Sequence, residues 1–235
     1  MKAGIIAAGE GSRLKAEGIS LPKPLIVVDG MPLIERLLNS YVRCGITEVA
    51  CIINEYSLQV KDFVEKKNFG IPIQFHVETT PSSMHSVLAL EPYLNQEKFL
   101  LSTVDSIFDD NDLKRFIRYA EDHPEKDGVL AITDFIDDEK PLYVQLNDDN
   151  NIIRFGKEGA VETPRWVTGG LYILSPKIFS EKQRVLAKGM ERLRNFLGYL
   201  LEQGYKIDAF PFSRIIDIDH VSDIRTAENL LRAQK

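Results

Sequence analysis

Apolar runs of strand length alternate with helix-length amphipathic stripes in the first half of this chain, and this alternation limits the folds open to it. The runs cover residues 3–8, 48–53, 73–77, 99–104 and 129–133. Most are uninterrupted, which is typical of strands buried on both faces. Strands that alternate with helices favour a parallel sheet, with ligands beyond the carboxyl ends of its strands. We therefore predict an α/β fold with a mostly parallel, mixed sheet and helices on both faces.

The helical stripes lie between these runs. Apolar residues recur at three- and four-residue spacing over 33–42, 58–64 and 113–120, as on one face of a helix. The second half differs, because strand-like segments at 143–146, 152–155 and 166–174 are separated by polar turns, which predicts an antiparallel or mixed extension of the sheet. Helices over 192–201 and 224–231 close the chain, and Ser222 is the expected cap of the second.

Composition narrows the classes of protein further. The 235 residues are 44% hydrophobic and carry a formal net charge of −6, so we predict a globular protein with no nucleic acid and no membrane as partner. No linker-like stretch divides the chain, and we predict one domain over 1–235. No signal-peptide core precedes the first strand, so a cytoplasmic location is expected. Cys44 and Cys51 predict buried thiols rather than a disulfide framework.

The first strand runs into the loop Gly9-Glu10-Gly11-Ser12-Arg13. Two glycines let the backbone turn tightly and present its N–H groups to an anion, for which phosphate is the natural candidate. The loop lacks the Lys-Ser/Thr pair of a Walker loop and the third glycine of a dinucleotide fingerprint. Lys23 follows between Pro22 and Pro24, which stiffen the backbone around its ammonium group.

Together, AAGEGSRL and the later PKPL resemble the signature of the nucleotidyltransferase family that makes nucleoside-diphosphate sugars. The segment VVDGMPLIERLLNSYVRCGITEVACIIN is similar in pattern to the region that follows in that family. The resemblance covers most of the chain, in patches after Thr79. It implies a Rossmann-like fold of the nucleotide-diphospho-sugar transferase type, with a nucleotide-binding half at about 1–135 and an acceptor-binding half at about 136–235.

The resemblance also implies roles for the loop. Arg13 and Lys23 would bind the phosphates and stabilise charge on the departing pyrophosphate, as the catalytic residues. The expected nucleotide-binding residues are Ala7, Ala8, Gly9, Gly11, Ser12, Thr79 and Ser83. Thr79 and Ser83 belong to the segment that reads the base in the family, but the usual glycine is missing here. Ser82 and Ser83 are equally suited to cap a helix over 84–90, so the base stays open.

Three aspartates are candidate metal ligands. Asp105 directly follows a buried strand, at the sheet edge where ligands bind, and the family places a metal-binding aspartate there, usually after glycine rather than Val104. Asp217 and Asp219 lie just before the last helix, where the family has its second metal-binding aspartate; of the two, Asp217 aligns better. Carboxylate and phosphate oxygens are the ligands that Mg2+ prefers, and we predict Mg2+ as cofactor.

The acceptor side resembles the family less closely. Lys157 follows a strand, as does the family's lysine for the acceptor phosphate, and Gly169 or Gly170 would let an acceptor approach the backbone. The expected reaction joins a nucleoside triphosphate to a sugar 1-phosphate and releases pyrophosphate. Two alternatives stay open: transfer to a non-sugar acceptor, such as a phosphocholine-like alcohol phosphate or a molybdenum-cofactor precursor, and a regulatory homologue that binds nucleotide without turnover.

Overall fold

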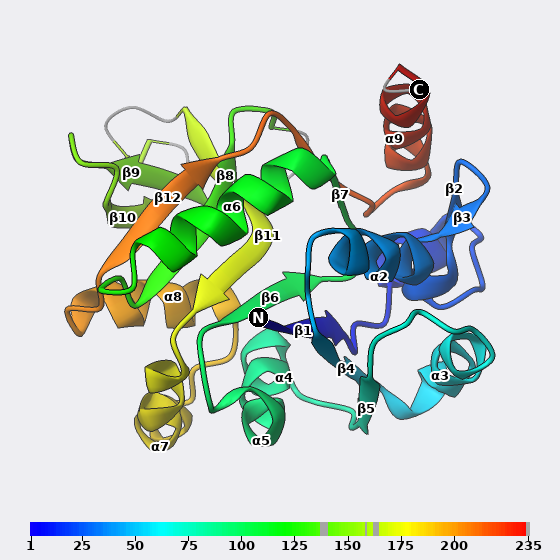
Figure 1. The fold of residues 1–235 in the computed structure, drawn as a ribbon, viewed down its shortest axis with the longest axis horizontal. Helices are drawn as coiled ribbons and strands as arrows, with labels where there is room; N and C mark the ends of the chain where they lie inside the picture. The colour runs from blue at the N-terminus through cyan, green and yellow to red at the C-terminus, as the bar shows by residue number, and fades with distance from the viewer. Residues whose placement is uncertain (137–140, 158, 162–164, 234–235) are drawn as a thin grey trace.

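A nine-stranded mixed sheet forms the centre of the protein (Figure 1). The computed structural model describes residues 1–136, 141–157, 159–161 and 165–233. The sheet path runs β10-β9-β11-β6-β1-β4-β5, while β8 pairs with β11 and β12 pairs with β8. Its strands are β1 (Lys2–Ala7), β4 (Glu48–Ile53), β5 (Ile73–Val77), β6 (Phe99–Thr103), β8 (Gly128–Thr133), β9 (Tyr143–Leu146), β10 (Ile152–Gly156), β11 (Trp166–Leu174) and β12 (Ile207–Pro211).

The strands that the first half contributes to this central sheet point the same way. β1 pairs in parallel with β4 and β6, and β4 pairs in parallel with β5. β11 comes from the second half and lies antiparallel to both β6 and β8. As a result, the carboxyl ends of β1, β6 and β8 and the start of β11 meet at one edge of the sheet. The predicted mixed, mostly parallel architecture is confirmed.

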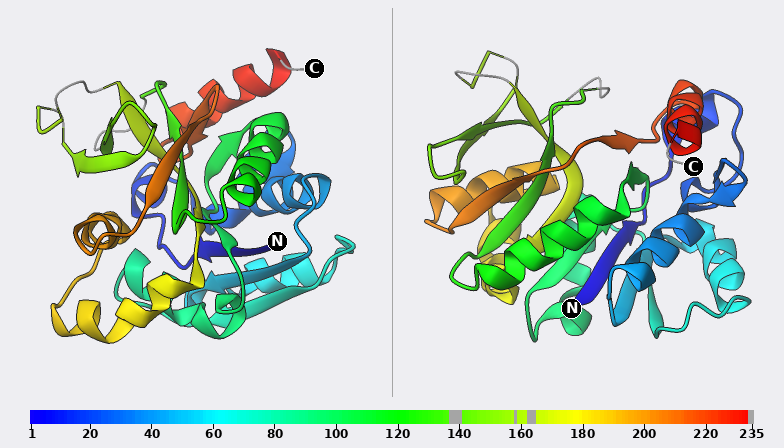
Figure 2. Two further views of the ribbon diagram at one scale, coloured as in Figure 1. Left: turned by 60° about the vertical axis from the view of Figure 1, so that its left-hand side comes forward. Right: turned by 45° about the horizontal axis from the view of Figure 1, so that its top comes forward.

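Helices cover both faces of the sheet, as predicted (Figure 2). The apolar sides of α2 (Leu33–Arg43), α3 (Leu58–Glu65) and α6 (Asp110–Asp122) share one core with it. On the opposite face lie α4 (Ser83–Ala89), α5 (Glu91–Leu94), α7 (Lys182–Ala187) and α8 (Leu193–Glu202). None of the helices in the described ranges combines the length and the hydropathy that crossing a bilayer requires.

Smaller elements gather at the carboxyl edge and the adjoining end of the protein. They are α1 (Ser12–Ala16), the hairpin of β2 (Val27–Val28) and β3 (Met31–Pro32), the ribbon of β7 (Ser106–Phe108) and β13 (Ile215–Asp217), α9 (Val221–Ala233), and the 3-10 turns η1 (Lys23–Leu25) and η2 (Glu55–Ser57). The 3-10 turn η3 (Pro176–Glu181) follows the end of β11 and lies at the opposite edge of the sheet. The hairpin, the ribbon and α9 share a third apolar cluster with α1. This cluster holds the C-terminal segment against the loop after β1.

The start of α9 corrects one prediction. Ser222 does not cap the helix, because α9 begins at Val221 and Ser222 lies in its first turn. Asp223 instead accepts hydrogen bonds from the backbone N–H groups of Asp219 (2.8 Å) and His220 (2.6 Å). An acid three residues into a helix that bonds back to the preceding N–H is half of a capping box. This bond pattern also fixes the backbone that carries Asp219.

At Gly170 and Gly198 we expect an added methyl group to change the free energy of unfolding in opposite directions. Gly170 has φ +73° and a Cβ there would lie 2.6 Å from Ser106 Oγ, whereas a Cβ on Gly198, inside α8, would meet nothing within 4 Å. We expect Gly170→Ala to lower the free energy of unfolding by about 1–3 kcal/mol through strain and overpacking. Gly198→Ala should raise it by about 0.5–1 kcal/mol. Urea unfolding of both variants checks the pair, and equal effects would contradict the assigned crowding at Gly170.

Candidate active site

The loop after β1 turns sharply to enter α1. Gly11 precedes α1 in the left-handed region, with φ 61° and ψ 37°, a conformation that costs glycine nothing. Its backbone also passes close to Lys23, since a Cβ on Gly11 would lie 3.5 Å from Lys23 Cβ. The Gly-x-Gly turn and the Pro-Lys-Pro segment, on either side of α1 in the sequence, are therefore in contact, as the sequence predicted for a shared phosphate site.

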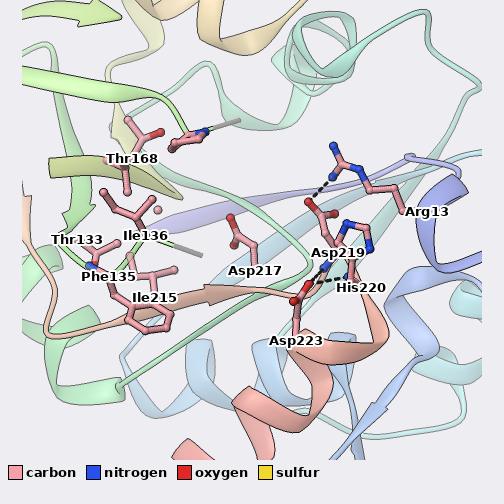
Figure 3. A pocket seen from close by; sticks show the side chains of 13 residues that line it. Arg13, Thr133, Phe135, Ile136, Thr168, Ile215, Asp217, Asp219, His220 and Asp223 are labelled. Atoms are coloured by element: carbon pink, nitrogen blue, oxygen red, sulfur yellow. Dashed lines mark hydrogen bonds and ion pairs between the residues drawn. The ribbon is translucent and has the colours of Figure 1, made fainter. Parts of the chain in front are cut away.

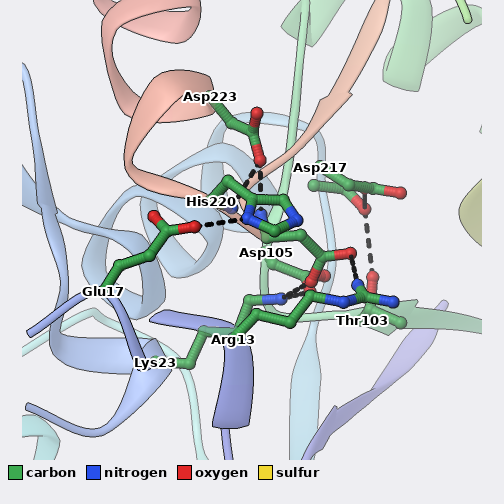
Figure 4. A network of polar contacts seen from close by, with 10 residues as sticks. Arg13, Glu17, Lys23, Thr103, Asp105, Asp217, His220 and Asp223 are labelled. Atoms are coloured by element: carbon green, nitrogen blue, oxygen red, sulfur yellow. Dashed lines mark hydrogen bonds and ion pairs between the residues drawn. The ribbon is translucent and has the colours of Figure 1, made fainter. Parts of the chain in front are cut away.

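Lys23 lies between two carboxylates from distant parts of the chain. Its ammonium donates hydrogen bonds to Asp105 Oδ2 and, at 2.7 Å, to Asp219 Oδ1. Arg13 Nη1 contacts the other oxygen of Asp219 at 2.6 Å. Figure 4 shows Arg13, Lys23 and Asp105 converging from α1, η1 and the end of β6. Asp219, from the segment before α9, joins them through its bonds to Lys23 and Arg13. Four of the predicted site residues thus form one network.

The network changes the proton affinity of its members. Burial alone would lower the pKa of Lys23, but the charges of Asp105 and Asp219 outweigh burial and hold that pKa well above its usual value. Burial alone would raise the pKa of Asp105, but the charge and hydrogen bond of Lys23 hold that pKa below its usual range. Both groups are therefore fully ionised near neutral pH, with their charges paired.

Asp217 is in a different environment. β13 pairs with β7 so that Asp217 lies opposite Ser106, whose hydroxyl donates to Asp217 Oδ1 at 2.6 Å. Burial, followed by the nearby charge of Asp105, raises the pKa of Asp217 to about 7. In Figure 3 its carboxylate points into a small cavity between Thr168 and Asp219. Asp217 therefore lies beside the network without an ionic partner among the described residues.

The donor set suits a divalent cation. Asp105 Oδ1 is buried and has no hydrogen-bond partner in the described part of the chain, which leaves a hard oxygen available. Asp105 and Asp219 also share one ammonium, so a cation of higher charge could bridge them once Lys23 contacts a phosphate. Among the described residues, no three histidine, cysteine or acidic side chains gather as a complete metal site. This arrangement fits Mg2+, which keeps several waters and uses one or two carboxylates.

Two larger cavities also lie beside the network. The one of about 310 Å3, here called the donor cavity, lies over the loop after β1. Of the predicted residues it is lined by Ala7, Gly9, Gly11, Ser12, Arg13, Lys23, Asp105 and Asp219. Ala8 lies beside this cavity with its carbonyl oxygen bonded to Asn54 Nδ2 at 2.9 Å. A second, of about 440 Å3, here called the adjoining cavity, shares Arg13, Thr103 and Asp219 with it.

The two predicted base-contacting residues lie apart. Ser83 lines the adjoining cavity, and its hydroxyl accepts a bond from the backbone N–H of Leu193 at 3.0 Å. Thr79 is exposed and accepts a long, 3.4 Å bond from the N–H of Glu55. Neither Ser82 nor Ser83 caps α4, because no side chain makes the capping bond; Ser82 donates to the carbonyl of Glu191 instead.

The acceptor residues predicted from the sequence are also separated. Lys157 is exposed just after β10, and it lines neither the donor nor the adjoining cavity. Gly169 lines the small cavity beside Asp217, but its lack of a side chain accommodates Ile215, whose Cδ1 would lie 2.1 Å from an added Cβ. The close approaches at Gly169 and Gly170 are thus made by the protein itself, which is a different reason from the one predicted.

Several site residues were not found from the sequence. His220 Nδ1 lies 2.5 Å from Glu17 Oε1, and that carboxylate also accepts a bond from the N–H of Val221 at 2.7 Å. These contacts tie α1 to α9 directly behind Arg13 and Asp219. Arg192 and Arg194 line the adjoining cavity. Asp223 could have been recognised as a cap, but no local pattern marks the two arginines.

Known proteins with similar sequences are nucleotidyl transferases. The family model described as "Nucleotidyl transferase" matches residues 2–234. Mannose-1-phosphate guanyltransferase beta-A of Xenopus laevis is 29% identical over 191 residues, which cover 78% of this chain and 52% of that protein. UTP–glucose-1-phosphate uridylyltransferase AglF of Haloferax volcanii is 23% identical over 238 residues, covering 100% and 98%. The chain thus spans about half the length of the guanyltransferase.

Solved structures share the fold at low sequence identity. The inositol-1-phosphate CTP transferase from T. maritima has a TM-score of 0.84 at 23% identity, covering 100% of this chain and 96% of that one. A putative glucose-1-phosphate thymidylyltransferase from Bacillus anthracis has a TM-score of 0.86 at 19% identity, covering 99% and 95%. With a family model that matches nearly every residue and a loop, basic pair and acidic pair gathered at one sheet edge, this chain belongs to the nucleotidyl transferase family.

Proposed function

We propose that this protein transfers a nucleotide from a nucleoside triphosphate to a sugar 1-phosphate or a similar hydroxyl-rich phosphate, in a Mg2+-dependent reaction. The observation that carries the proposal is the position of Lys23, between Asp105 and Asp219, on the wall of the donor cavity. Such a cluster can exchange its internal ion pairs for contacts with a triphosphate and its cation. A cytoplasmic location is part of the proposal.

In the proposed reaction, an oxygen of the acceptor phosphate attacks the α-phosphorus in line. The bond from the α-phosphorus to the oxygen that bridges to the β-phosphorus breaks, and pyrophosphate leaves with its electron pair. A phosphomonoester dianion attacks well without a protein nucleophile, so positioning and charge neutralisation are the protein's task. Arg13 and Lys23 would bind the β- and γ-phosphates and neutralise charge on the departing pyrophosphate.

The carboxylates complete the donor side. Asp105 and Asp219 are the proposed Mg2+ ligands because both contact the position now held by the Lys23 ammonium. Asp217 would reach the same cation from the side of the small cavity. When bound, the ion would neutralise charge on the α-phosphate and make the phosphorus more electrophilic. The backbone around Gly9 and Gly11 would bind the nucleotide.

The walls of the adjoining cavity favour a hydroxyl-rich acceptor over a quaternary ammonium. Thr103, Thr168 and Tyr172, which carry hydroxyl groups, are among the residues that line that cavity, and hydroxyl groups can exchange hydrogen bonds with a sugar or cyclitol. Quaternary ammonium ligands are usually bound by several aromatic faces, and Tyr172 is the one aromatic residue among the described residues that line it. A phosphocholine-like acceptor is therefore the weaker candidate.

Pyrophosphate release tests the proposal. The four nucleoside triphosphates are each combined with glucose 1-phosphate, mannose 1-phosphate, myo-inositol 1-phosphate and phosphocholine, with Mg2+ or with EDTA. We expect release that requires one triphosphate, one acceptor and Mg2+, and that EDTA abolishes. Triphosphate binding without release in any combination would favour the regulatory homologue instead.

A further inference from the structure

The adjoining cavity is the place where an acceptor can meet the α-phosphorus. It shares Arg13, Thr103 and Asp219 with the donor cavity, so the two cavities have a common wall. A reaction between two bound molecules needs their reacting atoms about 3–3.5 Å apart. The acceptor phosphate must therefore lie close to this wall, within reach of the side chains that line the adjoining cavity.

Arg192 and Arg194 are the basic residues that this cavity has and the donor cavity lacks. Arg192 is exposed and makes no ion pair with any residue in the described ranges. Arg194 is half-buried and lines the adjoining cavity together with Tyr172. Guanidinium groups bind phosphate through paired N–H donors, with both charge and directional hydrogen bonds.

The two arginines are held on a fixed backbone. The N–H of Leu193, which lies between them, donates to Ser83 Oγ at 3.0 Å, and the N–H of Met84 donates to the carbonyl of Glu191 at 3.2 Å. Ser82 donates to the same carbonyl. These bonds join the start of α8 to the start of α4, and Leu193 is itself buried. The backbone that carries both arginines is thereby held against the start of α4, beside the adjoining cavity.

We propose that Arg192 and Arg194 bind the phosphate of the acceptor, a role that the sequence pattern assigns to Lys157. The proposal rests on the nucleotidyl transfer proposed above and names the residues that select its second substrate. Lys157 is exposed and does not line the adjoining cavity, whereas both arginines do. The chemical class selected is a phosphomonoester, whose dianion two guanidinium groups can neutralise while leaving one oxygen to attack.

Equilibrium binding tests this assignment without turnover. The protein is titrated calorimetrically with glucose 1-phosphate, mannose 1-phosphate, myo-inositol 1-phosphate, phosphocholine and inorganic phosphate. Mg2+ and each of the four α,β-methylene nucleoside triphosphates are present, since these analogues occupy the donor cavity but cannot release pyrophosphate. We expect at least one phosphomonoester to bind, and Arg192→Ala or Arg194→Ala to weaken its binding by about tenfold to a hundredfold. Analogue binding should stay within about twofold of the unmodified protein, since neither arginine lines the donor cavity.

Matched variants show whether a loss of phosphomonoester binding comes from charge, from the paired donors or from an unrelated surface change. Arg192→Lys should recover part of the affinity, because it keeps the charge but loses the paired donors. Arg118→Ala removes an exposed arginine from α6 and should change nothing. Lys157→Ala should leave phosphomonoester binding intact. Loss of binding in Lys157→Ala, or unchanged binding in both arginine variants, would overturn the assignment.

The same titrations distinguish this proposal from the proposed function. If no analogue binds and no pyrophosphate is released, the nucleotidyl transfer itself is wrong. If an analogue binds but phosphomonoester binding does not depend on Arg192 and Arg194, only the acceptor assignment is wrong. Failure of all five phosphate probes to bind in the presence of a bound analogue would also overturn the acceptor assignment.

Discussion

Asp105→Asn is expected to lower the turnover number by about a hundredfold to a thousandfold while the protein still folds and binds the triphosphate. An asparagine would keep the size of the side chain but lose the charge that the proposed cation needs, and removing one preorganised electrostatic contact typically has this effect. Phosphate binding should persist, because Arg13 and Lys23 remain and one competing carboxylate is gone. Pyrophosphate release at saturating substrates, together with calorimetric binding of the triphosphate, checks both parts.

Asp110→Asn is the matched control for this variant. Asp110 belongs to the same region of the chain, but its carboxylate pairs with Arg43 at 2.5 Å on the surface, and Asp110 does not line the donor cavity. A surface ion pair contributes little to stability, so turnover and folding should both be nearly unchanged. Near-normal Mg2+-dependent turnover in Asp105→Asn would show that Asp105 is not a metal ligand.

Lys23→Met should destabilise the metal-free protein by about 3–5 kcal/mol and lower turnover by about a hundredfold or more. The side chains of Lys23 and Asp105 are 12% and 16% exposed, and removal of one member of a buried ion pair leaves the other charge uncompensated. Methionine keeps most of the volume, so the loss comes from charge rather than from a void. Urea unfolding in EDTA measures the stability, and pyrophosphate release measures the turnover.

Mg2+ should partly restore the stability of Lys23→Met. A cation that binds between Asp105 and Asp219 replaces the lost ammonium, so the increase in melting temperature on adding Mg2+ should be larger in the variant than in the unmodified protein. Lys66→Met, at an exposed position just after α3, should show the small response of the unmodified protein. An equal response in all three proteins would contradict a cation site between the two carboxylates.

The elements that the sequence predicted well are those marked by a periodic apolar pattern or by a short run of adjacent residues. The buried strands and the stripes of α2 and α6 show a regular apolar spacing, and the Gly9–Arg13 turn is specified by five adjacent residues. β12 was missed because buried Asp208 interrupts its apolar pattern. That carboxylate is compensated by Lys126 Nζ at 2.8 Å and by the Tyr119 hydroxyl at 3.0 Å, which lie more than eighty residues earlier.

In the candidate site, too, some residues are marked by local sequence and others depend on distant parts of the chain. Asp105 and Lys23 were found because a strand end and a proline pair mark them locally. The position of Asp217 depends on the register of β13 against β7, two strands of three residues each, and Asp219, beyond β13, is held by the bond from its N–H to Asp223. No periodic pattern specifies strands that short. Arg192 and Arg194 gain their importance only when α8 packs against α4, so their role required the tertiary structure.

The position of β11 has a consequence for the assembly of the protein. Because β11 lies between β6 and β8, the strands made first by the ribosome cannot complete their sheet until residue 174 has emerged. Until then β6 has an open edge, and β8 lacks the neighbour that joins it to the rest. The proposed nucleotide-binding and acceptor-binding halves therefore share one sheet, and neither half is expected to be an independent cooperative unit.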